Sequence, residues 1–141
     1  MVAMINRVIF KSTKPDYMTP DWLYKELNKE FNFNDDPCPF DEQAHALYPN
    51  DGLARTWGTS TFVNPPYGKE TIKWLRKAYE ESTLGKTIVC LIASRTDTKW
   101  WHDYCMKATE IRFIRGRLKF ENSQYSAPFP SAIVIFNGGY K

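Results

Sequence analysis

The feature that most constrains the fold of this chain is the run Thr87–Ala93, which reads TIVCLIA. It is apolar almost throughout and rich in β-branched residues, and it shows no alternation between apolar and polar positions. A strand with one face in water alternates, so a continuous apolar run is typical of a central strand that is covered on both faces. The sequence therefore predicts a layered fold in which helices flank a sheet.

The segments around this run alternate between helix and strand patterns. A helix is predicted to end near Phe31, with Thr19 as its N-cap and Pro20 as its first residue. The other expected elements are a short strand around Phe33 before an acidic turn, a helical turn at residues 42–47, a strand at residues 61–63, a helix ended by Gly85, a helix opened by residues 94–97, a strand, kink and strand over residues 110–120, and a last strand at residues 132–136. This order predicts an α/β fold, a compact and mainly parallel sheet with flanking helices, in a single domain over residues 1–141.

The composition excludes several classes of protein. A net charge of +3 permits contact with nucleic acid without demanding it. Cys38, Cys90 and Cys105 show no paired spacing, and His45 and His102 have no metal-ligand spacing, so neither a disulfide framework nor a metal site is expected. The sequence shows no signal-peptide pattern and no apolar run that approaches a membrane span, and we expect a cytoplasmic protein without a membrane partner.

Three polar segments directly follow candidate strands: Asp35-Asp36, residues 64–68 and residues 94–97. In open α/β sheets ligands bind beyond the carboxyl ends of the strands, so these segments are expected to form one ligand-binding edge. The chain has no G-x-S-x-G, P-loop or H-E-x-x-H motif, which argues against the hydrolase and nucleotide sites that those motifs build.

The segment after the strand at residues 61–63 reads Asn64-Pro65-Pro66-Tyr67-Gly68. Two prolines fix their own φ angles and favour an extended residue before them, so the Asn64 side chain and the Pro65 carbonyl can face one point as two acceptors. Two acceptors would draw the exocyclic amino nitrogen of a base towards tetrahedral geometry, and Tyr67 offers a ring on which a flipped base could stack. The alternatives are a proline-rich turn that only ends the strand, and a WW-domain ligand, which would need P-P-x-Y in a disordered segment.

Seven motifs in order resemble the phage-type DNA N6-adenine methyltransferases, over nearly the whole chain. They are Thr19-Pro20-Asp21-Trp22-Leu23, Asp36-Pro37-Cys38, Asp51-Gly52-Leu53 with Trp57, Asn64-Pro65-Pro66-Tyr67-Gly68, Arg95-Thr96-Asp97-Thr98 with Trp101-His102, Gly116-Arg117-Leu118-Lys119-Phe120, and Pro128-Phe129-Pro130-Ser131. The resemblance implies a Rossmann-like class I methyltransferase that uses S-adenosylmethionine to methylate the N6 amino group of a flipped adenine in DNA. If the chain is phage-encoded, the place of action is the host cell cytoplasm.

The resemblance also implies roles for individual residues. The catalytic residues would be Asn64, Pro65, Pro66 and Tyr67, and the cofactor-binding residues Thr19, Pro20, Asp36, Cys38, Asp51 and Asn64. Thr19 and Pro20 would help to hold the methionine part of the cofactor, and Asp36 its charged amino-acid end or its ribose. The usual glycine-rich cofactor loop is absent after Asp36, where two prolines follow, so weak cofactor affinity or help from a second subunit in a homodimer is expected.

Contact with DNA is expected from Arg95, Arg115, Arg117 and Lys119, the last three in a basic stretch that also holds Arg112. The alternative for the basic stretch is a solvated strand face, and Arg95 with Asp97 could instead order the loop after the central strand. Three other functions stay open on the residues alone: methylation of the N4 amino group of cytosine, a non-catalytic DNA-binding relative that has lost the cofactor, and methylation of a glutamine amide in a protein.

Overall fold

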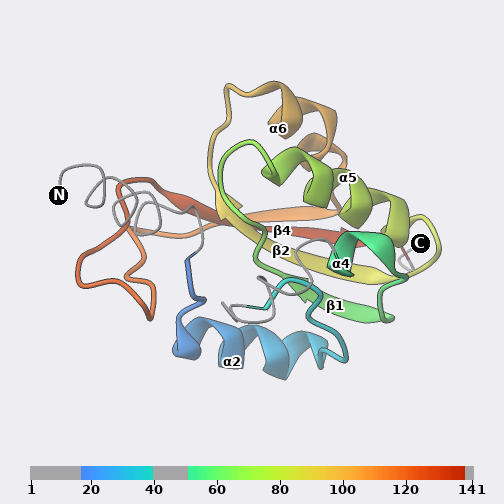
Figure 1. Cartoon of the computed structure of the whole chain (residues 1–141), viewed down its shortest axis with the longest axis horizontal. Coiled ribbons are helices and arrows are strands. Elements are labelled where there is room, and N and C mark those ends of the chain that lie inside the picture. Colours follow the sequence, from blue (N-terminus) through green and yellow to red (C-terminus); the bar gives the residue numbers. More distant parts are fainter. Residues whose placement is uncertain (1–16, 40–50, 139–141) are drawn as a thin grey trace, which may run out of the picture.

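The computed structural model of this chain describes residues 17–39 and 51–138, and a four-stranded sheet with the order β1-β2-β4-β3 lies at the centre of this part (Figure 1). The strands are β1 (Ser60–Val63), β2 (Thr87–Ala93), β3 (Glu110–Phe113) and β4 (Ser131–Asn137). The helices are α2 (Asp21–Phe31), α4 (Asp51–Ala54), α5 (Thr71–Ser82) and α6 (Lys99–Asp103), with a 3-10 turn η1 (Cys105–Lys107). No described helix is long and apolar enough to cross a membrane.

Strand β2 has the buried position that its sequence predicts. Val89 and Leu91 face a core cluster that includes Leu23 and Leu27 of α2, while Cys90 and Ile92 face a second cluster on the side of α5 and α6. The sheet accordingly lies between α2 on one side and α5 with α6 on the other (Figure 1). The prediction of an α/β layered fold is confirmed.

The prediction of a mainly parallel sheet is wrong, because most neighbouring strands pair antiparallel. Only β1 and β2 pair in parallel, whereas β2 with β4 and β3 with β4 pair antiparallel within the described sheet. A parallel neighbour needs a crossover, usually a helix, and residues 114–130 between β3 and β4 contain no helix. Strand β4 therefore returns in the opposite direction and inserts between β2 and β3, while β1, β2 and β3 all run the same way.

A second prediction is wrong in residues 114–130, which we call the 114–130 segment. Residues 117–120 were expected to form a strand after a kink, but the structure has no strand there. Gly116 turns the chain at φ +77°, in the region that favours glycine. Leu118 and Phe120 are buried and Lys119 between them is exposed, so the alternation reflects packing against the α2-side core cluster and not sheet pairing.

The start of α2 and the first strand also differ from the prediction. The N-cap of α2 is Pro20 and not Thr19, and no side chain caps it from that position. The expected strand around Phe33 is reduced to one parallel bridge between Asp35 and Thr61. That bridge, with the hydrogen bond from the Phe62 nitrogen to the Asp35 carbonyl oxygen, still runs residues 35–36 alongside β1. We call the edge of the sheet at the carboxyl ends of β1 and β2 the rim. The helical turn predicted at residues 42–47 lies outside the described residues.

Candidate active site

The side chain of Asn64 is held by two acceptors at the rim. Its Nδ2 donates to the Tyr17 carbonyl oxygen at 2.5 Å and to Thr19 Oγ1 at 3.0 Å. Its Oδ1 is buried and meets no hydrogen-bond donor in residues 17–39 or 51–138. An amide has two donor hydrogens and one acceptor oxygen, so both hydrogens are used and the oxygen remains as an acceptor for a ligand.

The loop after Asn64 is tied to the start of α5. Thr71 Oγ1 donates to the Pro66 carbonyl oxygen at 2.8 Å, and the Thr71 backbone nitrogen donates to the Gly68 carbonyl oxygen at 3.2 Å. Gly68 has φ +97°, a conformation that side-chain-bearing residues rarely adopt. Together with the two prolines, these bonds fix the course of the backbone that carries the Pro65 carbonyl.

Tyr67 lies in an aromatic cluster. Its ring centroid is 5.0 Å from that of Tyr17, 5.1 Å from that of Phe129 and 6.2 Å from that of Phe120. Only 9% of Tyr67 is exposed, and its hydroxyl has no hydrogen-bond partner among the described residues. Burial raises the pKa of this hydroxyl well above its usual value, so Tyr67 is neutral.

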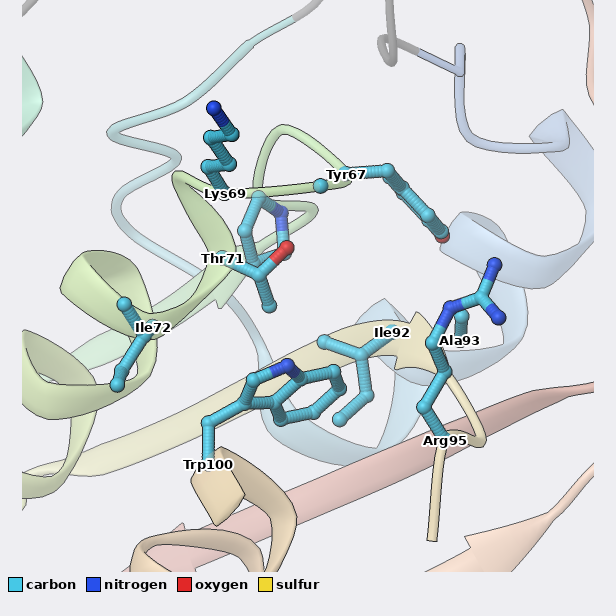
Figure 2. A pocket seen from close by; sticks show the side chains of 10 residues that line it. Tyr67, Lys69, Thr71, Ile72, Ile92, Ala93, Arg95 and Trp100 are labelled. Carbon is cyan, nitrogen blue, oxygen red and sulfur yellow. The ribbon is translucent and has the colours of Figure 1, made fainter. Parts of the chain in front are cut away.

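A cavity of about 420 Å³ opens beside this loop (Figure 2). Pro65, Tyr67, Ile92 and Ala93 contribute to its wall, and Trp100 of α6 closes one side with its indole ring. The charged side chains that line it are Lys69 and Arg95. Flat apolar walls with cations beside them suit a nucleobase with its phosphates.

The neighbouring residues Asp35 and Asp36 differ in how their carboxylates are hydrogen-bonded. Asp35 forms a bidentate ion pair with Arg55, at 2.8 and 2.9 Å, and accepts from the Gly58 backbone nitrogen at 2.8 Å. Asp36 has a buried Oδ1 to which nothing in the described part of the chain donates. Burial raises the pKa of Asp36 to about 6, against the hydrogen bond from the Cys38 backbone, which lowers it. A buried carboxylate oxygen without a donor is costly, which marks Asp36 Oδ1 as a candidate for ligand binding.

Helix α4 lies directly against the residue after Asp36. A Cβ on Gly52 would collide with the Pro37 carbonyl oxygen and with the Trp74 ring, so only glycine permits this approach. Asp51, the residue before Gly52, therefore belongs to a segment adjacent to Asp36, although its side chain lies outside the described part of the structure. The Cys38 side chain is buried in the core cluster on the α5 side.

The sequence model of the DNA N-6-adenine-methyltransferase (Dam) family matches residues 8–136. The chain belongs to this family. It is 31% identical over 124 residues to the DNA N-6-adenine-methyltransferase of Haemophilus phage HP1 (strain HP1c1), an alignment that covers 81% of this chain and 70% of the phage protein. No solved structure matches the fold significantly. The family predicted from the seven motifs is confirmed, and with it the activity on the N6 amino group of adenine in DNA.

In this member of the Dam family the predicted DNA-binding residues lie on two segments. Arg95 follows β2, is exposed, and lies over the Phe129 ring at 5.9 Å. Arg115, Arg117 and Lys119 are exposed on the 114–130 segment and have no acidic partner among the described residues. Arg112 of the same basic stretch instead pairs with Glu30 and Glu110 at 2.7 Å and is a structural residue.

Sequence reasoning missed the groups that hold Asn64 in this Dam family member. One is the Tyr17 backbone carbonyl, which no side-chain pattern can reveal. Glu121 and Asn122 act on Asn64 only indirectly, through hydrogen bonds with Met18 and Asp21, and in the sequence they look like ordinary loop residues. No cluster of possible metal ligands occurs in residues 17–39 and 51–138.

Proposed function

We propose that this chain methylates the N6 amino group of a flipped adenine in DNA with S-adenosylmethionine as the methyl donor, and that Asn64 and Pro65 accept the two hydrogens of that amino group. One observation carries the role of Asn64. Both hydrogens of its amide are bound by Tyr17 and Thr19, and its buried Oδ1 has no donor among the described residues. A buried acceptor without a partner is unfavourable unless a ligand supplies the donor.

The two acceptors act on the electronic state of the amino group. Its lone pair is delocalised into the adenine ring, which makes the nitrogen a poor nucleophile. We place Asn64 Oδ1 and the Pro65 carbonyl on one side of the amino group, so that hydrogen bonds to both draw its nitrogen towards tetrahedral geometry. When bound, S-adenosylmethionine supplies a methyl group on a positively charged sulfur, which leaves as a neutral thioether as the N–CH₃ bond forms. The surplus N6 proton then passes to solvent, so the chain needs no general base.

The residues assigned to the cofactor by the motifs suit a molecule of this kind. Asp36 Oδ1, which has no donor in the described part of the chain, is an acceptor for an ammonium group or a ribose hydroxyl. We assign Thr19, Pro20, Asp36, Cys38 and Asp51 to the cofactor, with Asn64 shared between cofactor and base. Three strands that run in one direction with a reversed fourth strand support a Rossmann-like class I fold in one domain.

DNA would approach from the rim. We place the flipped adenine in the cavity beside Pro65, where Tyr67 and Trp100 offer rings for stacking and Pro66 fixes the turn. Arg95, Arg115, Arg117 and Lys119 would contact phosphates of the surrounding duplex. Assembly as a homodimer and action in the cytoplasm of a host cell remain predictions.

Transfer of a tritiated methyl group from S-adenosylmethionine to DNA tests the proposal. Wild type and Gln124→Ala, a change at an exposed position without a described hydrogen bond, are expected to label N6-methyldeoxyadenosine. Asn64→Ala is expected to lose at least about 100-fold in rate, because one acceptor is gone. Equal rates in Asn64→Ala and wild type would remove the mechanism, and label on cytosine would select the N4 reaction. Calorimetry that shows DNA binding but no cofactor binding would instead identify a non-catalytic relative.

A further inference from the structure

Residues 17–21, which we call the strap, carry both groups that hold the Asn64 amide. The Tyr17 carbonyl oxygen and Thr19 Oγ1 accept its two hydrogens at 2.5 and 3.0 Å. Met18 lies between these two acceptors in the chain. The position of the Met18 backbone therefore sets the position of both acceptors, and with it the direction of Asn64 Oδ1.

The strap is held in turn by two neighbouring residues of the 114–130 segment. The Glu121 backbone nitrogen donates to the Met18 carbonyl oxygen at 3.0 Å, and the Met18 backbone nitrogen donates to Asn122 Oδ1 at 2.9 Å. The Asp21 backbone nitrogen donates to Glu121 Oε2 at 2.8 Å. This carboxylate lies at the amino terminus of α2, where the Pro20 N-cap makes no side-chain capping hydrogen bond and a negative charge is favourable.

Aromatic packing joins the same three parts of the chain. The Tyr17 ring lies 4.9 Å from Phe120 and 5.4 Å from Phe129 of the 114–130 segment, and 5.0 Å from Tyr67 of the loop after β1. Packed side chains of this kind transmit a displacement to their neighbours, because the interior leaves no room for independent movement. A shift of the 114–130 segment would therefore move the strap.

We propose that Glu121 and Asn122 are positioning residues for methyl transfer, which hold the strap and through it the orientation of the Asn64 amide. The same segment exposes Arg115, Arg117 and Lys119, so its contact with DNA and the orientation of Asn64 are coupled through these bonds. This inference rests on the proposed role of Asn64.

Steady-state kinetics with three variants of the full chain test this coupling. Asn122→Ala removes the acceptor for the Met18 nitrogen and is expected to lower kcat about tenfold, with KM for DNA and for S-adenosylmethionine within about threefold of wild type. Asn122→Asp keeps an acceptor oxygen and is expected to retain most of the wild-type kcat. Gln124→Ala, on the same segment without a described hydrogen bond, is expected to match wild type.

Hydrogen exchange of the Asn64 side-chain amide gives a readout that does not require catalysis. Its resonances are identified by their loss in Asn64→Ala. The two protons are expected to exchange slowly in wild type and Asn122→Asp, and at least about tenfold faster in Asn122→Ala, because they lose fixed acceptors. If Asn122→Ala does not fold, Glu121→Ala serves instead, with an expected threefold gain in exchange rate and a similar loss in kcat.

Wild-type exchange and kcat in Asn122→Ala, or in Glu121→Ala where it is the variant used, would overturn the inference. So would a loss in Asn122→Asp as large as in Asn122→Ala, since the acceptor would then be irrelevant. A wild-type protein that transfers no methyl group would refute the proposed function, while the exchange rates would still decide whether Asn122 holds the Asn64 amide.

Discussion

The Asn64 side-chain nitrogen lies 3.0 Å from the Thr19 hydroxyl oxygen, a contact between residues 45 positions apart in the sequence. This hydrogen bond and the one to the Tyr17 carbonyl occupy the amide nitrogen. The amide oxygen, Oδ1, is therefore the atom that can accept a hydrogen bond from a ligand. Thr19 thereby acts on Asn64 directly, in addition to the role towards the cofactor that its motif implies.

The change Asn64→Asp is expected to reduce methyl transfer, although aspartate also has an acceptor oxygen. Asn64→Asp would place a carboxylate oxygen where the amide nitrogen now donates to the Tyr17 carbonyl at 2.5 Å, and two acceptors would repel each other. We expect kcat to fall about 100-fold or more and stability to fall by roughly 1–3 kcal/mol. Methyl transfer and denaturant unfolding measure these effects. The matched control is Asn28→Asp, which keeps the oxygen that accepts from the Phe33 nitrogen and should retain activity; equal rates in both variants would contradict the assignment.

Removal of the Asp36 charge is expected to stabilise the ligand-free protein. The pKa of Asp36 is raised on folding to about 6, so the folded protein holds this proton more tightly than the unfolded chain. The resulting loss of stability is absent below the ordinary pKa near 3.8 and grows as the pH rises through 6. Asp36→Asn should therefore raise the free energy of unfolding by roughly 1–3 kcal/mol at pH 7.5, and by less at pH 4.5, while it weakens cofactor binding.

The neighbouring carboxylate supplies the control for that experiment. The pKa of Asp35 is lowered, because hydrogen bonds from Arg55 and Gly58 outweigh the effect of burial. Asp35→Asn should accordingly lower stability at pH 7.5, opposite in sign to Asp36→Asn. Urea unfolding at both pH values decides the question, and a loss of stability in both variants would count against a ligand-directed Asp36.

Salt dependence should separate the cations that bind DNA from those that support the fold. Arg117→Gln is expected to reduce the slope of log affinity against log salt concentration by about 1, because one phosphate contact is lost. Arg112→Gln should leave the slope unchanged, since Arg112 already pairs with Glu30 and Glu110. Fluorescence anisotropy with a labelled duplex at several salt concentrations gives both slopes, and a change of equal size in the two variants would contradict the assignment.

Glu81 is expected to be the most important buried charge for stability. It accepts from Lys86 Nζ at 2.5 Å and from the Trp57 nitrogen at 3.2 Å, and it pairs with Lys77 at 3.2 Å. Burial alone would raise its pKa, but these contacts lower it, so its stabilising effect is lost as the pH falls through that lowered pKa. Glu81→Ala should cost roughly 2–4 kcal/mol in denaturant unfolding near neutral pH, whereas the exposed Glu80→Ala should change stability little.

The local patterns of the sequence were sufficient for most of the elements. The continuous apolar run Thr87–Ala93 forms a strand and a helix precedes it, as expected, although α5 ends at Ser82 with Thr83 and not Gly85 as its C-cap. The direction of β4 was not accessible in this way, because an apolar strand looks the same whichever way it pairs. The strand predicted at residues 117–120 was wrong for a related reason. The alternation around Leu118 and Phe120 shows which side chains are buried, but it does not show whether the backbone pairs with a neighbouring strand.

The residues of the candidate site also differ in whether a short sequence pattern can reveal them. Asn64 was predicted from a motif in which neighbouring residues constrain one another. Its partners Tyr17, Glu121 and Asn122 act through a backbone carbonyl or across long sequence separations, so no short pattern contains them. That Asn64 Oδ1 and Asp36 Oδ1 have no donor among residues 17–39 and 51–138 emerges only when each hydrogen bond has been assigned to its donor.

The reversed direction of β4 has a consequence for how such a protein can diversify. Strand β3 ends at the rim and β4 begins there, with Phe113 opposite Ala132 in the ladder, so the 114–130 segment leaves and re-enters the sheet at adjacent points. Insertions or exchanges in this segment would leave the register of every strand intact. If residues 120–122 keep their contacts with the strap, the rest of the segment is free to vary, and a new DNA sequence preference can be acquired without rebuilding the catalytic centre.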